Sequence, residues 1–151
     1  MAVTINGTSG VTTPGISSSG AIATTGSATI TSAGNMTGSA ELIAVSYNET
    51  YAALSGTTPT VNCEAGNFFS LTTSGNTTFT FSNPPSSGTA FGFTLQLTAG
   101  GTHTITWPGT VDWAGATAPD APASGETDIL VFTTRDGGTN WYGALAIDAA
   151  G

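Results

Sequence analysis

NTTFTFSNPPSSGTAFGFTLQLTAGGTHTITW, residues 76–107, is the segment that decides the fold class. Bulky apolar residues occupy every second position in three parts of it: Phe79 and Phe81; Phe91, Phe93, Leu95 and Leu97; Ile105 and Trp107. Successive residues of a β-strand point to opposite faces, so each part predicts a strand with one apolar face. The intervening residues are mostly threonine, which suits a face that meets water or a polar neighbour.

Turn signals separate these strands from one another and from further strand patterns. Ala99-Gly100-Gly101-Thr102 predicts a turn, because glycine reaches positive φ without steric cost. Upstream, residues 60–64 and 68–72 continue the pattern as a meander of short strands. Downstream, Asp128–Thr134 is apolar on both faces, which indicates a central strand covered on both sides. The Asp-Gly turn after it predicts that residues 140–145 return antiparallel.

These patterns favour an all-β fold with about eight strands, namely a β-sandwich of jelly-roll-like type. Residues 1–40 differ in character, because glycine interrupts threonine, serine and alanine segments that carry only isolated larger apolar residues. Such a segment cannot close a core alone. We therefore expect an extended N-terminal arm over residues 1–40, either ordered by neighbours or a flexible linker, and a β-sandwich domain over residues 41–151.

Charge restricts the partners. Nine acidic residues face a single basic one, Arg135, which gives a net charge of -8. Nucleic acid and anionic membrane surfaces both need a cationic protein surface, so neither is an expected partner. Only 7% of the residues are charged, and an exterior of hydroxyls, amides and glycine suits packing against copies of itself or against a larger protein wall. We therefore expect a homo-oligomer.

Three segments in the second half carry a resemblance to a known family. They are GNTTFTFSNPPSSGTAFGFTLQLT (residues 75–98), TITWPGTVDWAGATAP (104–119) and TDILVFTTRDGGTNWYGALA (127–146). In this order they closely resemble a C-terminal module of tailed-bacteriophage proteins, namely tail fibres and other virion structural proteins. The opening MAVTINGTSGVTTPG is similar to the start of many phage fibre and appendage proteins.

The resemblance implies a β-structured, trimeric virion component without catalysis, assembled in the host cytoplasm. Residues 1–40 would then dock it to other virion proteins of the capsid or the tail. Only about forty residues precede the module, which keeps a capsid decoration protein open as an alternative to a tail fibre. A module that binds host-surface glycans through residues 83–89 and 114–126 is a further alternative.

Candidate catalytic groups are sparse. His103 is the sole histidine, and the sequence pairs it with no orienting acid or nucleophile. Cys63 alternates with polar neighbours and has almost no cation nearby to activate it, so a buried thiol is expected. A calcium site among the carboxylates of residues 112–128 lacks the spacing of an EF-hand. We expect no enzyme activity, cofactor or metal.

Four residues are the candidate contacts to sister chains or to a receptor: Arg135, Asp136, Trp113 and Tyr142. Arg135 and Asp136 stand together in the Asp-Gly turn, where they form either a local pair or a bridge to a neighbouring subunit. The aromatic residues Trp107, Trp113, Trp141 and Tyr142 lie in strand patterns, which favours core or interface packing over sugar stacking.

Overall fold

A computed structural model describes residues 46–150 of the 151-residue chain. The chain divides into two units, Met1–Ile43 and Ala44–Gly151, and the described residues belong to the second. The predicted arm, residues 1–40, and the predicted boundary at residue 41 lie outside the described residues. Within residues 46–150 the fold is all-β, as predicted, with strands β1 to β10 and one short 3-10 turn, Ala114–Ala116.

Six strands form the larger sheet, in the spatial order β1-β3-β6-β9-β10-β8. Their bounds are β1 (Tyr51–Ala53), β3 (Phe68–Thr72), β6 (Phe91–Thr98), β9 (Thr127–Thr134), β10 (Trp141–Ala150) and β8 (Val111–Trp113). The predicted antiparallel return after the Asp-Gly turn is confirmed, because β9 pairs antiparallel with β10 and Tyr142 lies opposite Thr133. The strand predicted to be central, β9, does lie between β6 and β10.

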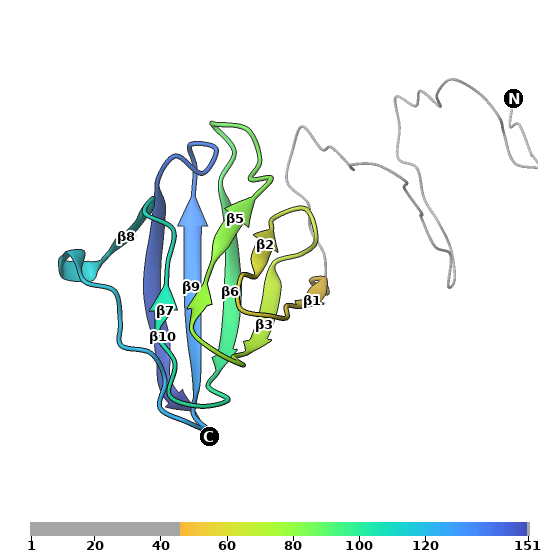
Figure 1. The fold of residues 1–151 in the computed structure, drawn as a ribbon. Helices are drawn as coiled ribbons and strands as arrows, with labels where there is room; N and C mark the ends of the chain where they lie inside the picture. Colours follow the sequence, from red (N-terminus) through yellow and green to blue (C-terminus); the bar gives the residue numbers. More distant parts are fainter. Residues whose placement is uncertain (1–45, 151) are drawn as a thin grey trace, which may run out of the picture. The chain divides into compact units, whose positions relative to one another are not determined.

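Four short strands form a second, smaller layer: β2 (Thr60–Asn62), β4 (Thr77–Thr78), β5 (Thr80–Ser82) and β7 (Ile105–Thr106). Phe79 alone separates β4 from β5, and its N–H donates to the carbonyl of Thr106 at 2.9 Å. The segment from β4 to β5 is therefore bonded to β7 on one side and to β2 on the other. Figure 1 shows this layer in front of the larger sheet, which gives a two-layered sandwich.

The chain alternates between the two layers from β1 to β7. It runs from β1 to β2, from β3 to β4 and β5, and from β6 to β7, so that each strand lies parallel to its counterpart in the previous turn of the chain. Five of the seven strand pairings are parallel. The expected meander of sequential neighbours is therefore wrong for this part of the chain, which coils between the layers instead.

An aromatic core fills the space between the layers. Phe93 is at its centre, stacked on Phe132 with ring centroids 4.9 Å apart and edge-on to Phe69 and Phe81 at 5.5 and 5.1 Å. Burying one such ring stabilises the fold by about 1.5–3 kcal/mol. The alternation predicted from the sequence is confirmed here, because Phe93, Leu95 and Leu97 are all buried and the residues between them are not.

The glycine turn at residues 99–102 connects the two layers rather than two neighbouring strands. β6 ends in the larger sheet and β7 begins in the smaller layer, where it pairs with β4. Gly100 is required for this crossing, since a Cβ there would lie 2.2 Å from the carbonyl oxygen of Thr73. The turn is thus in the predicted place but joins different partners.

Candidate functional site

The β9–β10 turn contains two of the four predicted contact residues, Arg135 and Asp136. The Asp136 carboxylate accepts hydrogen bonds from Thr134 Oγ1 at 2.9 Å and from the backbone and side chain of Asn140 at 3.0 and 2.7 Å. These bonds, with those of the Asn140 backbone foremost, lower the pKa of Asp136 below its ordinary value. Asp136 therefore organises its own turn, while Arg135 is exposed.

Trp113, the third predicted contact residue, belongs to the edge of the core. Its ring centroid lies 5.4 Å from that of Trp107 and 5.6 Å from that of Phe132, and it is half-buried. It also covers Gly143 of β10, where a Cβ would approach the ring to 2.7 Å. The expected core or interface packing of the tryptophans thus takes the form of core packing for Trp113, and Trp141 is only 2% exposed.

Tyr142, the fourth predicted contact residue, is exposed at the surface, with a relative exposure of 54%. It lies opposite Asp112 of β8, whereas its neighbour Gly143 lies opposite Trp113. Consecutive residues point to opposite faces, so Tyr142 and Trp113 are on opposite faces of the larger sheet. The four predicted residues therefore do not form one site: two share the β9–β10 turn, and the other two lie on opposite faces of the larger sheet.

His103 contacts a hydroxyl and a glycine turn. Its Nδ1 lies 2.8 Å from Oγ1 of Thr73, and the same oxygen accepts a hydrogen bond from the backbone N–H of Gly100 at 3.1 Å. The imidazole packs on Gly101, at whose Cβ position Cε1 would be 3.1 Å away. These contacts connect the glycine turn to the end of β3, and no hydrogen bond among the described residues links the imidazole to a carboxylate.

Cys63 is buried, as predicted, and belongs to the hydrophobic core. Burial raises the pKa of its thiol to about 11, with a smaller contribution from the neighbouring carboxylate of Glu64. The thiolate is the nucleophilic form, so this thiol is unreactive at neutral pH in the folded protein.

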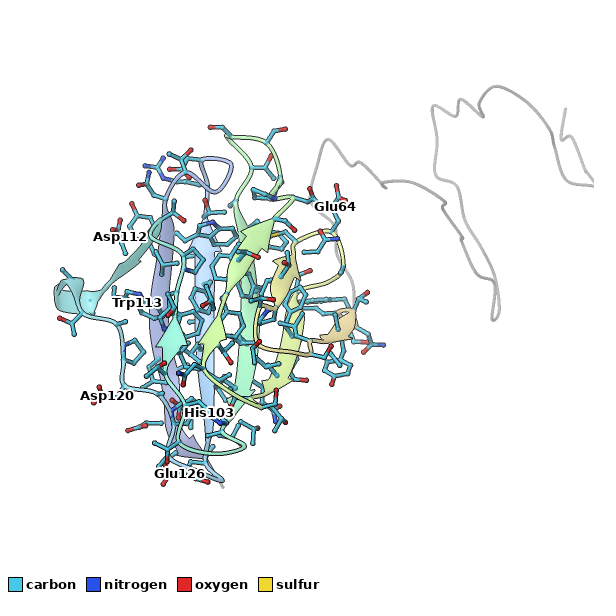
Figure 2. The ribbon with its side chains drawn as sticks, in the orientation of Figure 1. Glu64, His103, Asp112, Trp113, Asp120 and Glu126 are labelled. Atoms are coloured by element: carbon cyan, nitrogen blue, oxygen red, sulfur yellow. The ribbon has the colours of Figure 1, made fainter. Side chains whose placement is uncertain are left out.

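The carboxylates are dispersed over the domain. Figure 2 shows Glu64, Asp112, Asp120 and Glu126 at separate places around its periphery. Glu126 accepts a bond from the backbone N–H of Ala123 at 3.2 Å within its own loop. Over residues 46–150 no three side chains of the metal-binding types are grouped closely enough to hold an ion. Within the same range no helix has the length and apolarity needed to cross a membrane.

Of the two predicted glycan-binding loops, one covers a narrow hollow and the other is hydrogen-bonded to neighbouring parts of the domain. Residues 119–122 cover a hollow beside Leu97, Trp107 and Leu130 that is too narrow to admit a water molecule. In the other loop, the side-chain amide of Asn83 donates to Asn62 Oδ1 at 3.0 Å, and the N–H of Gly88 donates to the carbonyl of Arg135.

The larger sheet has an outer face, which points away from the smaller layer. Register and burial assign these central-strand residues to it: Ser70, Thr72, Thr94, Gln96, Thr98, Ile129, Val131, Thr133, Tyr142, Ala144 and Ile147. None of them is charged. β9 was expected to be covered on both sides. Among the described residues it is covered on its inner side only, and Val131 on its outer side is 39% exposed.

A hollow of about 240 Å³ lies on this outer face, and sequence reasoning did not find it. It is lined by Glu49, Asn67, Gly92, Thr94 and Val131, with Phe93 and Phe132 at its base. Gly92 opens it, because a residue without a side chain stands where its neighbours project. Asn67 frames it by donating from Nδ2 to the carbonyl of Gly92 at 2.8 Å. The sequence signal was a lone glycine within the alternating β6.

Comparison with known proteins adds no family. No family model matches the sequence, and neither a curated protein nor a solved structure matches it.

Proposed function

We propose that this chain is a non-enzymatic structural subunit of a tailed-bacteriophage particle, acting as an oligomeric β-sandwich of a tail fibre, a tail appendage or the capsid exterior. The outer face carries this proposal on the structural side, because it is a partly apolar surface whose central strands carry no charged side chain, which suits protein contacts. The assignment to a phage particle rests on the resemblance of residues 75–98, 104–119 and 127–146 to the phage module. Residues 1–40 would dock the subunit.

Two features of the described residues support a role without catalysis. The sole histidine is bonded to a threonine hydroxyl, and the sole cysteine has a pKa of about 11. A thiol nucleophile needs a lowered pKa or a base within reach, whereas the pKa of Cys63 is raised.

Mass spectrometry of purified particles tests the proposal directly. The chain is expected as a stoichiometric component of particles freed of host protein, and its absence would refute the virion assignment. Copy number then decides between the locations. A number that follows the capsid shell subunits supports a decoration protein, whereas a few copies per particle support a tail component.

The docking role of residues 1–40 has its own test. A chain that lacks them is expected to keep the β-rich circular dichroism spectrum and the unfolding midpoint of the full chain, because the aromatic core lies entirely within residues 46–150. The truncated chain is expected to be missing from particles that assemble in its presence. Incorporation at the level of the full chain would remove the docking role and leave the virion assignment standing.

A glycan-binding module of the host surface is the second candidate. Exposed Tyr51 and Tyr142 favour it, since aromatic rings with a polar tip are suited to binding sites that are partly wet. Retention of the purified chain on host-envelope polysaccharide, lost on Tyr142→Ala, would support this candidate. Free passage through the same matrix would exclude it.

A further inference from the structure

β9 is apolar on both of its sides, although only one side faces the core. Leu130 and Phe132 point into the core. Ile129 and Val131 point outward, and Val131 is 39% exposed. Strands with apolar residues on both sides are typical of sheets that are covered on both faces. The outer face therefore presents an apolar centre that a further molecule can cover.

One row of residues across this face ends in a carboxylate on each side. At one end, Asp112 of β8 lies opposite Tyr142 of β10. The row continues through Thr133 of β9 to Gly92 of β6. Beyond it, exposed Glu49, two residues before β1, lines the hollow of about 240 Å³ that the glycine opens. Five strand spacings separate β8 from β1, about 24 Å in all, so the two carboxylates are far apart.

No basic residue belongs to this row. The single Lys or Arg of the whole chain is Arg135, in the turn that follows the last residue of β9. Opposite charges across a contact favour binding and like charges oppose it. A second copy of this chain has a net charge of -8 and brings the same two carboxylates, so it matches this face poorly. The charge that complements the two ends of the row is positive.

The hollow has the chemistry of a site for a lysine or arginine side chain. Its base and Val131 are apolar, so they can contact the aliphatic stem of such a residue. The carboxylate of Glu49 can accept hydrogen bonds from the cationic head. Asn67 is held in place by its Nδ2, which donates to the carbonyl of Gly92 at 2.8 Å, and its Oδ1 is a further acceptor.

We propose that the outer face binds a partner protein through an apolar patch that carries a lysine or arginine on either side. One of the two cations occupies the hollow at Gly92 beside Glu49, and the other pairs with Asp112. The apolar patch covers Val131 and the ring of Tyr142, which belong to strands between these two ends.

The two kinds of contact have different roles. Exposed ion pairs contribute little affinity, whereas complementary charges select among partners. The apolar patch therefore supplies most of the affinity, and the carboxylates select a basic partner. The inference rests on the protein-contact role that the proposed function gives to the outer face. A homo-oligomer of the chain would use another surface.

NMR titration of the isotope-labelled full chain with synthetic peptides tests this partner chemistry. The probe is Lys-Thr-Val-Thr-Val-Thr-Lys, whose extended form has both valines and both lysines on one side, with the lysines about 20 Å apart. At low ionic strength it is expected to shift the amide resonances of Gly92, Val131 and Tyr142. Matched peptides with glutamate in place of lysine, or with serine in place of valine, are expected to bind at least about 10-fold more weakly.

Paired variants locate the bound peptide. Glu49→Gln is expected to weaken binding about 3-fold or more, because the hollow loses its carboxylate. Asp120→Asn removes the same charge from an exposed position in the loop between β8 and β9, and is expected to bind like the wild type. Val131→Thr keeps the shape of the side chain but is less apolar, so binding is expected to weaken. Arg135→Gln is expected not to weaken it. The spectrum of each variant shows directly whether it is folded.

Several results would overturn the inference: no shifts with the lysine peptide, equal binding of the glutamate peptide, or Glu49→Gln and Asp120→Asn with equal effects. Shifts of the same amides on dilution of the chain alone would assign the face to a second copy and overturn it too. Maltohexaose that shifts these amides where the lysine peptide does not would assign the face to a glycan. None of these results touches the virion assignment, which the composition of purified particles decides.

Discussion

Trp113 on β8 lies directly over Gly143 on β10, so close that a single added methyl group on Gly143 would be 2.7 Å from Cζ3 of the indole. The two residues are paired in register at the edge of the larger sheet. The absence of a side chain on Gly143 allows the indole to close the core against Phe132. The indole of Trp113, a predicted contact residue, therefore also packs against the edge of the core.

Gly143→Ala is expected to destabilise the protein by about 1–3 kcal/mol, because the indole must move from a packed position. Urea denaturation followed by tryptophan fluorescence measures the change. Gly109→Ala is the matched control, since a Cβ at Gly109 meets no atom within 4 Å, and its effect is expected within about 0.5 kcal/mol. Equal unfolding midpoints for the two variants would contradict the close packing of Trp113 on Gly143.

Asp136→Ala is expected to lower stability at pH 7, because the turn loses the acceptor for Thr134 and Asn140. The pKa of Asp136 is lowered in the folded protein from an ordinary value of 3.8, so its stabilising contribution is present above that pH. The contribution is lost as the pH falls through the folded pKa. The difference in unfolding midpoint between wild type and variant should therefore shrink below about pH 4.

Arg135→Gln is the control for this turn. Its expected effect on the free energy of unfolding is within about 0.5 kcal/mol, because the hydrogen bonds to Asp136 come from Thr134 and Asn140. A loss as large as that of Asp136→Ala would mean that an ion pair with Arg135 stabilises the turn.

Cys63 is expected to react slowly with iodoacetamide in the folded protein. A thiol pKa raised from 9.0 to about 11 lowers the thiolate fraction at pH 8 by about 100-fold. Urea should restore the rate of a free thiol, and mass spectrometry of the alkylated chain measures both rates. Folded protein that is alkylated as fast as the urea-unfolded chain would contradict the burial of this side chain.

The same pKa predicts a loss of stability in alkali. Because the folded pKa lies above the unfolded one, the contribution of the protonated thiol is complete below about pH 9 and is lost as the pH rises through about 11. Unfolding midpoints measured from pH 8 to 11 should fall more for the wild type than for Cys63→Ala, which has no thiol to titrate. Parallel curves for the two proteins would exclude a role for Cys63 ionisation.

The period-two alternation was sufficient to assign strands and faces but not strand neighbours. Phe93, Leu95 and Leu97 are buried as predicted, because side-chain direction in a strand is a local property. Pairing is a long-range property: Thr77 pairs directly and parallel with Ile105, although β6 of the other layer lies between them in the sequence. A glycine turn after β6 is equally compatible with a hairpin and with a crossing between layers, so the sequence predicted an antiparallel meander.

The prediction of contact residues failed to place them relative to one another for the same reason, because their relative positions depend on strand pairing. Tyr142 and Trp113 are both aromatic residues in strand patterns, and only the register of β8 on β10 places them on opposite faces. The hollow at Gly92 depends on Asn67 and Val131, which come from different parts of the chain. A glycine in an otherwise alternating strand was its one local signal.

Substitution of Thr73 tests the hydrogen bond from Gly100 that connects the end of β3 to the glycine turn. Its hydroxyl is buried, accepts from the N–H of Gly100 at 3.1 Å and lies 2.8 Å from Nδ1 of His103. Thr73→Val keeps the shape but removes the oxygen, which leaves the glycine N–H without its partner at a cost of about 1–3 kcal/mol. Urea denaturation measures the total loss, and amide hydrogen exchange at Gly100 measures the local one. Thr72→Val, at the exposed neighbouring position, is expected to change stability by less than about 0.5 kcal/mol. If the Gly100 amide exchanges at the same rate in Thr73→Val and in the wild type, this hydroxyl does not stabilise the turn.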